Sequence, residues 1–452
     1  MAESNTEQPN GASTTPAAPP LTTYTPRYID IGINLADPIF RGRYHGKSRH
    51  PDDLKGVVGR AVEVGCTKLI VTGSSFKSSR DALKLTKEFP GTVFATAGIH
   101  PCSSSIFSPS HHKHHDESQS EGEDEAEHTP ACGPDPTKPI LDGDGVDHAR
   151  SATIIADLAT LITQARTTTT TSSSSSSPSP SPGLVAFGEF GLDYDRLHYC
   201  SKEVQLHSFS VQLALAASLS PQLPLFLHSR AAHADFVRLL KEAFGPRLER
   251  LERGGVVHSF TGTAEEMREL MDLGLYIGIN GCSFKTAENC AVVRGVELER
   301  LMIETDGPWC EVRPSHEGWK YLVELEVKAK AAAAAAAAAE ADAAAAAAES
   351  AVPPEGQEGH GEAGQPERKQ RPKKQQQQQQ GKKNQKKEPE VPERYNVVKK
   401  EKWEEGAMVK GRNEPCTIER IAKIVAGIKG VSVEEVCEAA WANTVKVFGV
   451  DS

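Results

Sequence analysis

Eight short apolar runs, spread along most of the chain, constrain its fold more than any other feature of the sequence. Each run is rich in Val, Ile and Leu, and each is apolar throughout rather than alternating with polar residues. Strands that are buried on both faces, as in parallel sheets, have this pattern. We therefore expect strands at 28–34, 68–73, 92–99, 184–190, 223–228, 255–260, 275–279 and 300–305.

Helical patterns separate most of these runs. The first, at 51–65, has Pro and acidic residues in its first turn and Gly at its end. Alternating strands and helices of this number predict an α/β protein, a closed (β/α)₈ TIM barrel, with a doubly wound open sheet as the structural alternative. Further helices are expected at 78–89, 148–166, 201–219, 232–244, 263–274, 417–430 and 432–449, and the weakest helical pattern is 283–299.

Long low-complexity segments interrupt the globular part of the chain. Residues 1–26 form a polar tail, and inserts of biased composition are expected at about 103–146, 167–182 and 327–390. What remains is roughly 300 residues, enough for one large core. We predict a single barrel domain over 27–451 that carries these inserts. The alanine run at 331–348 has high intrinsic helicity and could form a helix that packs on nothing.

Charge and cysteine content restrict the partners of the protein and the cellular compartment in which it acts. The net charge of −10 argues against a generally cationic coat for nucleic acid, although a local basic cleft is compatible with it. Nine cysteines without a C-x-x-C pair fit free thiols in a reducing compartment. No apolar run approaches the roughly 20 residues of a membrane span. We expect an intracellular protein of the cytoplasm, the nucleus or both, not secreted, not bound to membranes and monomeric.

Polar residues with metal-binding side chains stand where several predicted strands end. Strand ends of a (β/α)₈ barrel converge on one face, where such enzymes carry their active sites. A lone histidine at a strand end is usually structural, but several ligand-type residues at neighbouring strand ends favour a site for a divalent cation such as zinc, manganese or magnesium. The residues in question are His100, Glu189, His228, His258 and Asp306, with Asp30 and Asn34 on the first strand.

For two further residues near these strand ends, a functional role and a purely structural role are equally compatible with the sequence. Arg230, two residues after His228, could clamp a phosphate or lie at the surface. Asp193, four residues after Glu189, could orient a metal ligand or cap a turn.

The ordered motifs of the chain resemble those of the TatD family of metal-dependent deoxyribonucleases, and most closely its eukaryotic branch of TatD DNase domain-containing proteins. The resemblance covers about 28–102, 183–325 and 393–449. It implies an amidohydrolase-like TIM barrel that hydrolyses phosphodiester bonds. The motifs are "YIDIGINL", "AGIHP", "GEFGLDYDR", "PLFLHSR", "GVVHSFTGT", "YIGINGCSFKT", "LMIETDGPWC" and "GRNEPC".

The resemblance also implies roles for individual residues. Its metal ligands fall on Glu189, His228, His258 and Asp306, and the histidine near the substrate phosphate falls on His100. Many members begin with D-x-H-x-H, whereas this chain, like the eukaryotic branch, has Gly32 and Asn34 at the two histidine positions. We therefore expect one strong cation position, with a second ion recruited weakly through Asn34 and the substrate.

The expected reaction is metal-assisted hydrolysis of DNA, with trimming from a 3′ end implied by the resemblance. Mg²⁺ is the expected cofactor, with Mn²⁺ and Zn²⁺ as alternatives. Asp306 is the expected general base, with Glu189 and His100 beside it in catalysis and Arg230 and Asn34 on the substrate side. Two other functions remain open at this point: hydrolysis of another ester or amide, such as an aminoacyl-tRNA, and a non-catalytic adaptor for nucleic acid or protein.

Overall fold

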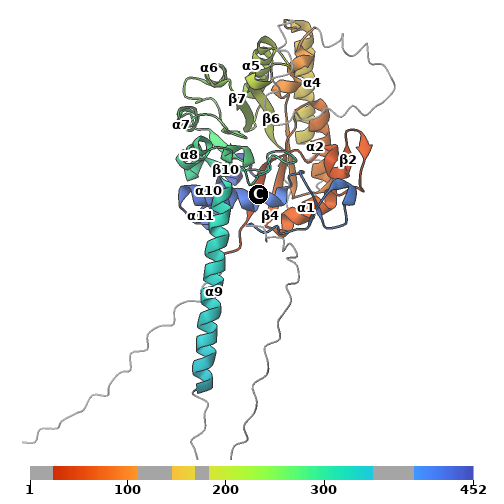
Figure 1. The fold of residues 1–452 in the computed structure, drawn as a ribbon. Coiled ribbons are helices and arrows are strands. Elements are labelled where there is room, and N and C mark those ends of the chain that lie inside the picture. The colour runs from red at the N-terminus through yellow and green to blue at the C-terminus, as the bar shows by residue number, and fades with distance from the viewer. Residues whose placement is uncertain (1–23, 110–144, 168–182, 350–390, 451–452) are drawn as a thin grey trace, which may run out of the picture.

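Eight parallel strands form one sheet that curves into a barrel, as Figure 1 shows in the computed structural model. The structure describes residues 24–109, 145–167, 183–349 and 391–450. The expected (β/α)₈ barrel is confirmed, and each predicted apolar run overlaps one strand of this sheet. In sheet order, the strands are β1 (Tyr28–Ile33), β4 (Cys66–Val71), β5 (Val93–Ala97), β6 (Leu184–Asp193), β7 (Leu225–Arg230), β8 (Gly255–Val257), β9 (Tyr276–Ile279) and β10 (Leu301–Ile303).

The two ends of this order, β1 and β10, are joined by hydrogen bonds of the segment that follows β10. The backbone N–H of Asp306 donates to the carbonyl of Gly32 (2.8 Å), and the N–H of Asn34 donates to the carbonyl of Gly307 (2.8 Å). The buried carboxylate of Asp30 accepts from the N–H of Thr305 (3.0 Å) and from its hydroxyl (2.5 Å). This seam places the loop after β10 directly over the end of β1.

Helices cover the outside of the barrel and bury their apolar faces against the strands. Side chains such as Leu69, Phe187 and Leu227 form one core with those of the helices, between the sheet and its cover. The helices are α1 (Leu54–Glu63), α2 (Phe76–Glu88), α4 (His148–Thr167), α5 (Lys202–Ser218), α6 (His233–Phe244), α7 (Ala264–Asp272), α8 (Ala287–Gly295), α9 (Trp319–Glu349), α10 (Ile418–Lys429) and α11 (Val433–Phe448).

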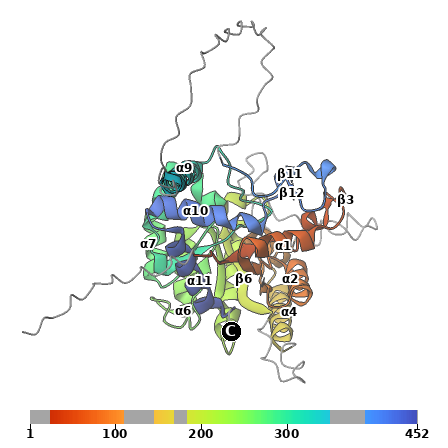
Figure 2. The same cartoon turned by 90° about the horizontal axis from the view of Figure 1, so that it is seen from below.

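A second core fills the inside of the barrel. Inward-facing residues such as Ile31, Phe94 and Phe226 pack there with Trp441 and Phe448 of α11. Helix α11 also donates from Asn443 Nδ2 to the backbone carbonyl of Leu301 at the start of β10 (2.8 Å). Helix α11 therefore covers the amino-terminal end of the strands (Figure 2), which leaves their carboxyl ends for the functional site.

Short elements lie in the loops that connect the strands and helices of the barrel. They are η1 (Pro38–Arg41), β2 (Arg43–Tyr44), β3 (Lys47–Ser48), η2 (Pro101–Phe107), η3 (Tyr194–Arg196), η4 (Gly281–Phe284), η5 (Leu298–Arg300), β11 (Val397–Val398), η6 (Lys400–Lys402), β12 (Met408–Val409) and η7 (Pro415–Thr417). Much of the expected low-complexity sequence, residues 110–144, 168–182 and 350–390, lies outside the described residues. The first insert was expected to start at about 103, but Phe107 of η2 is fully buried.

The helix predicted for the alanine run is part of a longer one. Helix α9 begins at Trp319, packs its first turns on α10, and then extends away from the barrel as one rod (Figure 1). The ring of Trp319 lies under the guanidinium of Arg420 of α10, 5.9 Å from it. From Val327, which is 61% exposed, to residue 346 the helix is exposed to solvent. Within the described ranges, none of the helices combines the length and apolar character that a membrane crossing requires.

Candidate active site

The carboxyl ends of the strands surround a small cavity that contains the predicted site residues. Glu189 lies on β6 and His228 on β7, His258 follows β8, and Asp306 follows β10. The fold thus brings together four residues that are up to 117 positions apart in the sequence. The lining residues are Asn34, His100, Glu189, Arg196, His228, Arg230, His258, Ser259, Asp306 and Trp309.

Three imidazole rings gather around one carboxylate oxygen of Glu189. Its Oε1 lies 2.6 Å from Nε2 of His258, 3.2 Å from Nδ1 of His228 and 3.4 Å from Nε2 of His100. All four side chains are buried. Burial would raise the pKa of Glu189, but the three surrounding imidazoles, His258 foremost, together outweigh burial and hold this pKa well below its ordinary value. Glu189 is therefore an ionised carboxylate at the bottom of the cavity.

A second buried carboxylate fixes the ring of His228 from behind. Asp193 Oδ2 lies 3.0 Å from Nε2 of His228, while the other ring nitrogen faces Glu189. Burial alone would raise the pKa of Asp193, but the hydrogen bond to His228 and the charges of Arg196 and Arg230 hold it below its ordinary value. An ionised Asp193 accepts a hydrogen bond from Nε2–H of His228, so the lone pair of Nδ1 points into the cavity.

The same arrangement recurs at His258. Its Nε2 faces Glu189, and its Nδ1 faces Oε2 of the fully buried Glu304 at 3.5 Å. Burial would lower the pKa of His258, but the carboxylates of Glu189 and Glu304 outweigh burial and raise it well above the ordinary value. The negative surroundings of this ring favour a positive charge at the centre of the cluster.

The ring of His100 is neutral. Burial lowers the pKa of His100 to about 3. Its Nδ1 accepts a hydrogen bond from the backbone N–H of Cys102 (3.1 Å), so the proton is on Nε2. That N–H points toward Glu189 and the cavity. His100 can thus donate a hydrogen bond to an anionic group bound there.

Asp306 is held at the edge of the cavity by two side chains. Its Oδ1 accepts from Nδ2 of Asn34 (3.0 Å), and its Oδ2 accepts from the thiol of Cys310 (3.2 Å). Asn34 in turn accepts from the hydroxyl of Thr72 (2.6 Å). The amide of Asn34, which we expected on the substrate side, therefore points at Asp306 and orients its carboxylate.

The donor set fits a divalent cation. Glu189 Oε1, His228 Nδ1 and His258 Nε2 all lie within 4.8 Å of one another, and Asp306 lines the same cavity. Imidazole and carboxylate are the ligands that zinc, manganese and related ions take from proteins. Each histidine has a carboxylate behind it, which is the usual support of metal-bound imidazoles. The cluster thus has the donor atoms and the supporting carboxylates that could hold a divalent cation.

Sequence reasoning missed two of the residues that build this site. Glu304 stands two positions before Asp306 in "IETDGPW", and Arg196 stands three after Asp193 in "GLDYDR". Arg196 Nη1 donates to Asp193 Oδ2 (3.1 Å), and its side chain is only 4% exposed. The quoted motifs contained both residues, but only the three-dimensional arrangement shows that they face His258 and Asp193. Arg230, which we did single out, lines the cavity.

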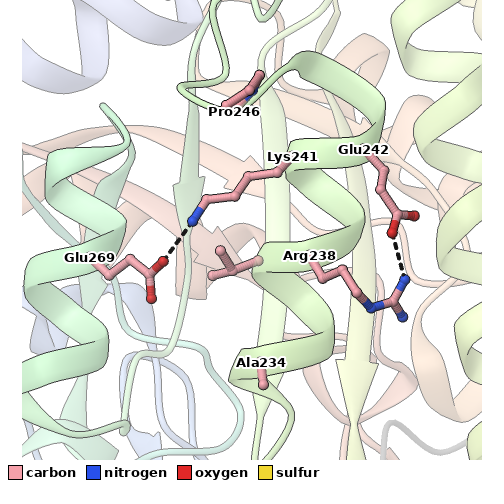
Figure 3. Close-up of a pocket in the computed structure, with 7 residues that line it drawn as sticks. Ala234, Arg238, Lys241, Glu242, Pro246 and Glu269 are labelled. Carbon is pink, nitrogen blue, oxygen red and sulfur yellow. Dashed lines mark hydrogen bonds and ion pairs between the residues drawn. The ribbon is translucent and has the colours of Figure 1, made fainter.

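Another groove lies outside the barrel between α6 and α7, and Figure 3 shows its lining residues. Lys241 of α6 and Glu269 of α7 point toward one another and pair at 2.8 Å. Arg238 and Glu242 pair along α6 at 2.8 Å. These charges neutralise one another on the helical face of the barrel, so the groove lacks the convergent ligands of the cavity at the strand ends.

Comparison with known proteins decides the family. The family model described as TatD related DNase matches residues 29–352. The chain belongs to the TatD DNase family. The resemblance predicted from the motifs is thereby confirmed, and so is the expectation of a hydrolase that acts on ester bonds.

Individual relatives agree over most of this TatD family chain. Deoxyribonuclease Tat-D of Schizosaccharomyces pombe is 34% identical over 422 residues, which cover 93% of this chain and 96% of the relative. The 3′-5′ ssDNA/RNA exonuclease TatD of Edwardsiella piscicida is 32% identical over 62% of this chain and 79% of its own. The crystal structure of an uncharacterized amidohydrolase from Saccharomyces cerevisiae superimposes with a TM-score of 0.64 at 28% identity, covering 94% of this chain and 100% of that one.

Proposed function

We propose that this protein is a metal-dependent deoxyribonuclease that hydrolyses DNA phosphodiester bonds from the 3′ end. The observation that carries the proposal is the paired geometry of His228 and His258. Each ring faces Glu189 with one nitrogen and a buried carboxylate with the other. The 3′ preference is supported by the bacterial relative that is named a 3′-5′ exonuclease.

Glu189, His228, His258 and Asp306 would hold the cation. A divalent ion at this position supplies Lewis-acid polarisation of a phosphoryl oxygen and lowers the pKa of a water molecule. We infer Mg²⁺ as the working ion, because the carboxylates are hard oxygen ligands and the cavity opens to solvent. The two imidazole nitrogens suit Mn²⁺ or Zn²⁺ as well, so a test of the function has to compare all three ions.

Asp306 is the residue we assign as general base. Its carboxylate lines the cavity and is ordered by Asn34, which limits its rotation. Oriented in this way, Asp306 accepts a proton from the attacking water. Asn34 acts through Asp306 in this assignment, and it engages the substrate only if the hydrogen bond to Asp306 is exchanged.

His100 and Arg230 are the residues we assign to the phosphate. The neutral ring of His100 keeps its Nε2 proton and donates it as a hydrogen bond to a phosphate oxygen. Arg230, at the end of β7, adds a positive charge that lines the same cavity. Both side chains stabilise negative charge that grows on the phosphate during hydrolysis.

The remaining properties of the protein follow from sequence and fold together. We propose one barrel domain with insertions after β5, between α4 and β6, and after α9. The protein would act as a monomer in a reducing compartment, the cytoplasm or the nucleus. Eight described cysteines with free thiols support the reducing environment.

Hydrolysis of end-labelled oligonucleotides tests the function directly. Single-stranded and duplex DNA with a 5′ label should give a ladder that shortens from the 3′ end in Mg²⁺ or Mn²⁺, and none in a chelator. A phosphorothioate block at the 3′ terminus should stop the reaction, whereas the same block at the 5′ terminus should not. Products cut only internally would contradict the 3′ preference. Intact DNA with all three ions would contradict the nuclease function.

The variant His258→Ala connects the activity with the site. Its DNA hydrolysis should fall to background in every ion. A matched control is His233→Ala on α6, whose ring pairs with Glu269 outside the barrel. Wild-type activity and metal content in His258→Ala would overturn the assignment. Tight DNA binding without cleavage by the wild-type protein would favour an adaptor, and cleavage of an aminoacyl ester without DNA hydrolysis would favour the other hydrolase.

A further inference from the structure

Two cysteines lie side by side behind Asp306. Cys282 belongs to η4, which follows β9, and Cys310 lies in the loop after β10. Their Sγ atoms are 2.7 Å apart, although the residues are separated by 28 positions in the sequence. Both side chains are reduced thiols in this structure. Sulfur atoms at this separation are closer than two unbonded thiols usually are, and a disulfide bond is about 2.05 Å long.

The backbone is shaped to bring these two thiols together. A Cβ atom on Gly281 would collide with the backbone carbonyl of Cys310, so only glycine lets the two loops approach this closely. Asn280 fixes the start of η4 by accepting from the N–H of Cys282 (2.9 Å). Cys310 itself adopts a φ of 53°, which is costly for a residue other than glycine. The contacts of both loops therefore hold the pair in place.

One of these thiols also contacts the proposed general base. The Sγ of Cys310 donates to Oδ2 of Asp306 (3.2 Å), on the side opposite to the Asn34 hydrogen bond. Asp306 has a positive φ of 51° as well. The orientation of its carboxylate thus depends on both partners. A chemical change at Cys310 therefore reaches Asp306 through the hydrogen bond between them.

We propose that Cys282 and Cys310 form a reversible intramolecular disulfide that slows the enzyme. The formation of the bond is independent of the proposed function, whereas its effect on DNA hydrolysis rests on that function. Cys310 is the partly exposed partner and Cys282 is buried. An oxidant from solvent therefore reaches Cys310 first, and Cys282 resolves the intermediate.

The chemistry is a two-electron exchange with a small disulfide such as oxidised glutathione. The sulfur of Cys310, after loss of its proton to water, attacks one glutathione sulfur, and a glutathione thiolate leaves. Cys282, also after loss of its proton, then attacks the Cys310 sulfur of the mixed disulfide. The second glutathione thiolate leaves, and both thiolates take up the released protons. Two protein thiols are oxidised, and one glutathione disulfide is reduced to two thiols.

Bridging changes the surroundings of Asp306 in two ways. Oδ2 of Asp306 loses the hydrogen bond that it accepts from Cys310, because a disulfide sulfur carries no hydrogen. The two sulfurs also move roughly 0.7 Å closer together, from 2.7 Å to the length of the bond. Cys310 is thereby drawn toward η4. We expect weaker cation binding and a kcat about tenfold lower, the effect of losing one hydrogen bond to a charged group.

Full-length protein equilibrated in glutathione buffers of rising oxidised fraction tests the proposal. Digestion after thiol blocking, followed by mass spectrometry, should yield a peptide pair joined through Cys282 and Cys310. Its amount should rise as DNA hydrolysis and the affinity for Mn²⁺ fall, and dithiothreitol should reverse all three. Failure to detect this pair overturns the disulfide. A fully bridged protein with unchanged Mn²⁺ affinity and hydrolysis overturns its regulatory effect.

Three variants separate the bridge from other oxidation. Cys282→Ala should keep the hydrolysis rate of the reduced wild-type protein and yield no bridged peptide. With oxidised glutathione it should stop at the mixed disulfide on Cys310, which mass spectrometry distinguishes from the bridge, and Cys282→Ser is the substitute if the alanine variant folds poorly. Cys310→Ala should be slow without oxidant, and Cys310→Ser, which retains a hydroxyl donor, should recover the rate. Cys290→Ala, a buried cysteine of α8, is the matched control and should stay sensitive. Should the wild-type protein leave DNA intact, the bridged peptide and the Mn²⁺ affinity still decide the proposal.

Discussion

Nδ1 of His258 and Oε2 of Glu304 face each other at 3.5 Å, and within the described part of the chain neither atom has a hydrogen-bond partner. The other oxygen of Glu304 accepts from the backbone N–H of Ser259 (2.5 Å) and from Nδ2 of Asn280 (3.3 Å). One oxygen thus anchors the carboxylate, and the other is directed at the imidazole. A carboxylate directed at the ring in this way favours the proton on Nδ1, so that the lone pair of Nε2 can bind a cation.

Glu304→Gln should weaken cation binding because the amide keeps the shape of the side chain and removes its charge. We expect the affinity for Mn²⁺ to fall about 10- to 100-fold, as is typical when the carboxylate behind a metal-bound histidine is lost. Titration calorimetry of the chelator-treated protein measures this. DNA hydrolysis should recover partly when Mn²⁺ is raised.

The exposed residue Glu299, close in sequence, provides the control for this prediction. Glu299→Gln also removes one carboxylate, but from the surface of η5. Its Mn²⁺ affinity should equal that of the wild type. Equal affinities in all three proteins would mean that Glu304 does not act on His258.

The carboxylate of Glu304 also explains the glycine in the first motif. A Cβ atom on Gly32 would collide with Oε2 of Glu304 and come within 3.3 Å of Cζ of Phe226. The histidine pair that begins many TatD sequences therefore cannot be restored by substitution at Gly32 alone, because Glu304 occupies the space. Gly32 marks the close approach of β1 to a buried acid, as glycines inside strands often do.

Gly32→Ala should thus act on metal binding through Glu304. The added methyl group displaces Oε2 from His258, so we expect a loss of Mn²⁺ affinity of the same order as in Glu304→Gln. Because both changes break one interaction, the double variant should be hardly weaker than either single variant. Calorimetry of the four proteins in a double-mutant cycle checks this. Additive losses would show that the two residues act separately.

The barrel and the meeting of its ligands could be predicted because both follow from local patterns. Strands buried on both faces are continuously apolar, and the residue that ends such a strand lies on a known face of the barrel. His228 and Asp306 could be placed for that reason. Predicting their positions required only the boundaries of the strands and their parallel order.

The supporting residues could not be predicted because their partners are distant in sequence. Glu304 faces His258 from another strand end, and Cys310 reaches Cys282 only because Gly281 permits two loops to touch. Asn34, which we expected on the substrate side, lines the cavity, and its hydrogen bond to Asp306 across the seam between β1 and β10 could not be read from the sequence. No periodicity encodes such contacts.

The loop between η2 and α4 offers a test of how the first insert is attached. The backbone N–H of Asp147 donates to the carbonyl of Phe107 (2.9 Å), so the two ends of the insertion are adjacent. Replacing residues 110–144 with a short Gly/Ser linker should leave the melting temperature and the DNA hydrolysis rate nearly unchanged. Extending the deletion through the buried Phe107 should cost about 3–5 kcal/mol, the usual cost of removing a core phenylalanine. Equal melting curves for both deletions would contradict the packing role of η2.

Asp30, in the seam between β1 and β10, makes the stability of the fold depend on pH. Its buried carboxylate accepts from the N–H of Gly32 (3.2 Å) and from the N–H and hydroxyl of Thr305. Burial raises the pKa of Asp30 to about 8, and the hydrogen bonds from Thr305 only partly oppose this. In the unfolded chain the same carboxyl has its ordinary pKa of about 4. Between these two values the folded state binds a proton that the unfolded state does not.

The sign of the pH dependence follows from this difference. Stability from Asp30 is fully present below about pH 4, falls as pH rises toward 8, and is lost above the folded pKa. The slope is up to about 1.4 kcal/mol per pH unit. Asp30→Asn mimics the protonated acid, since its amide can donate to the hydroxyl of Thr305 and its oxygen can accept from the same N–H groups. The variant should therefore lose less stability than the wild type between pH 5 and 8, and be the more stable protein at pH 9.

Urea denaturation in the presence of a chelator, at one-unit steps from pH 5 to 9, measures both curves without a contribution from bound cations. Asp157→Asn, a change at an exposed position of α4, is the control and should follow the wild type at every pH. Parallel curves for Asp30→Asn and the wild type would mean that Asp30 keeps one protonation state throughout. Since Asp30 ties β1 to the segment that carries Asp306, the two curves also report on the seam on which the candidate active site rests.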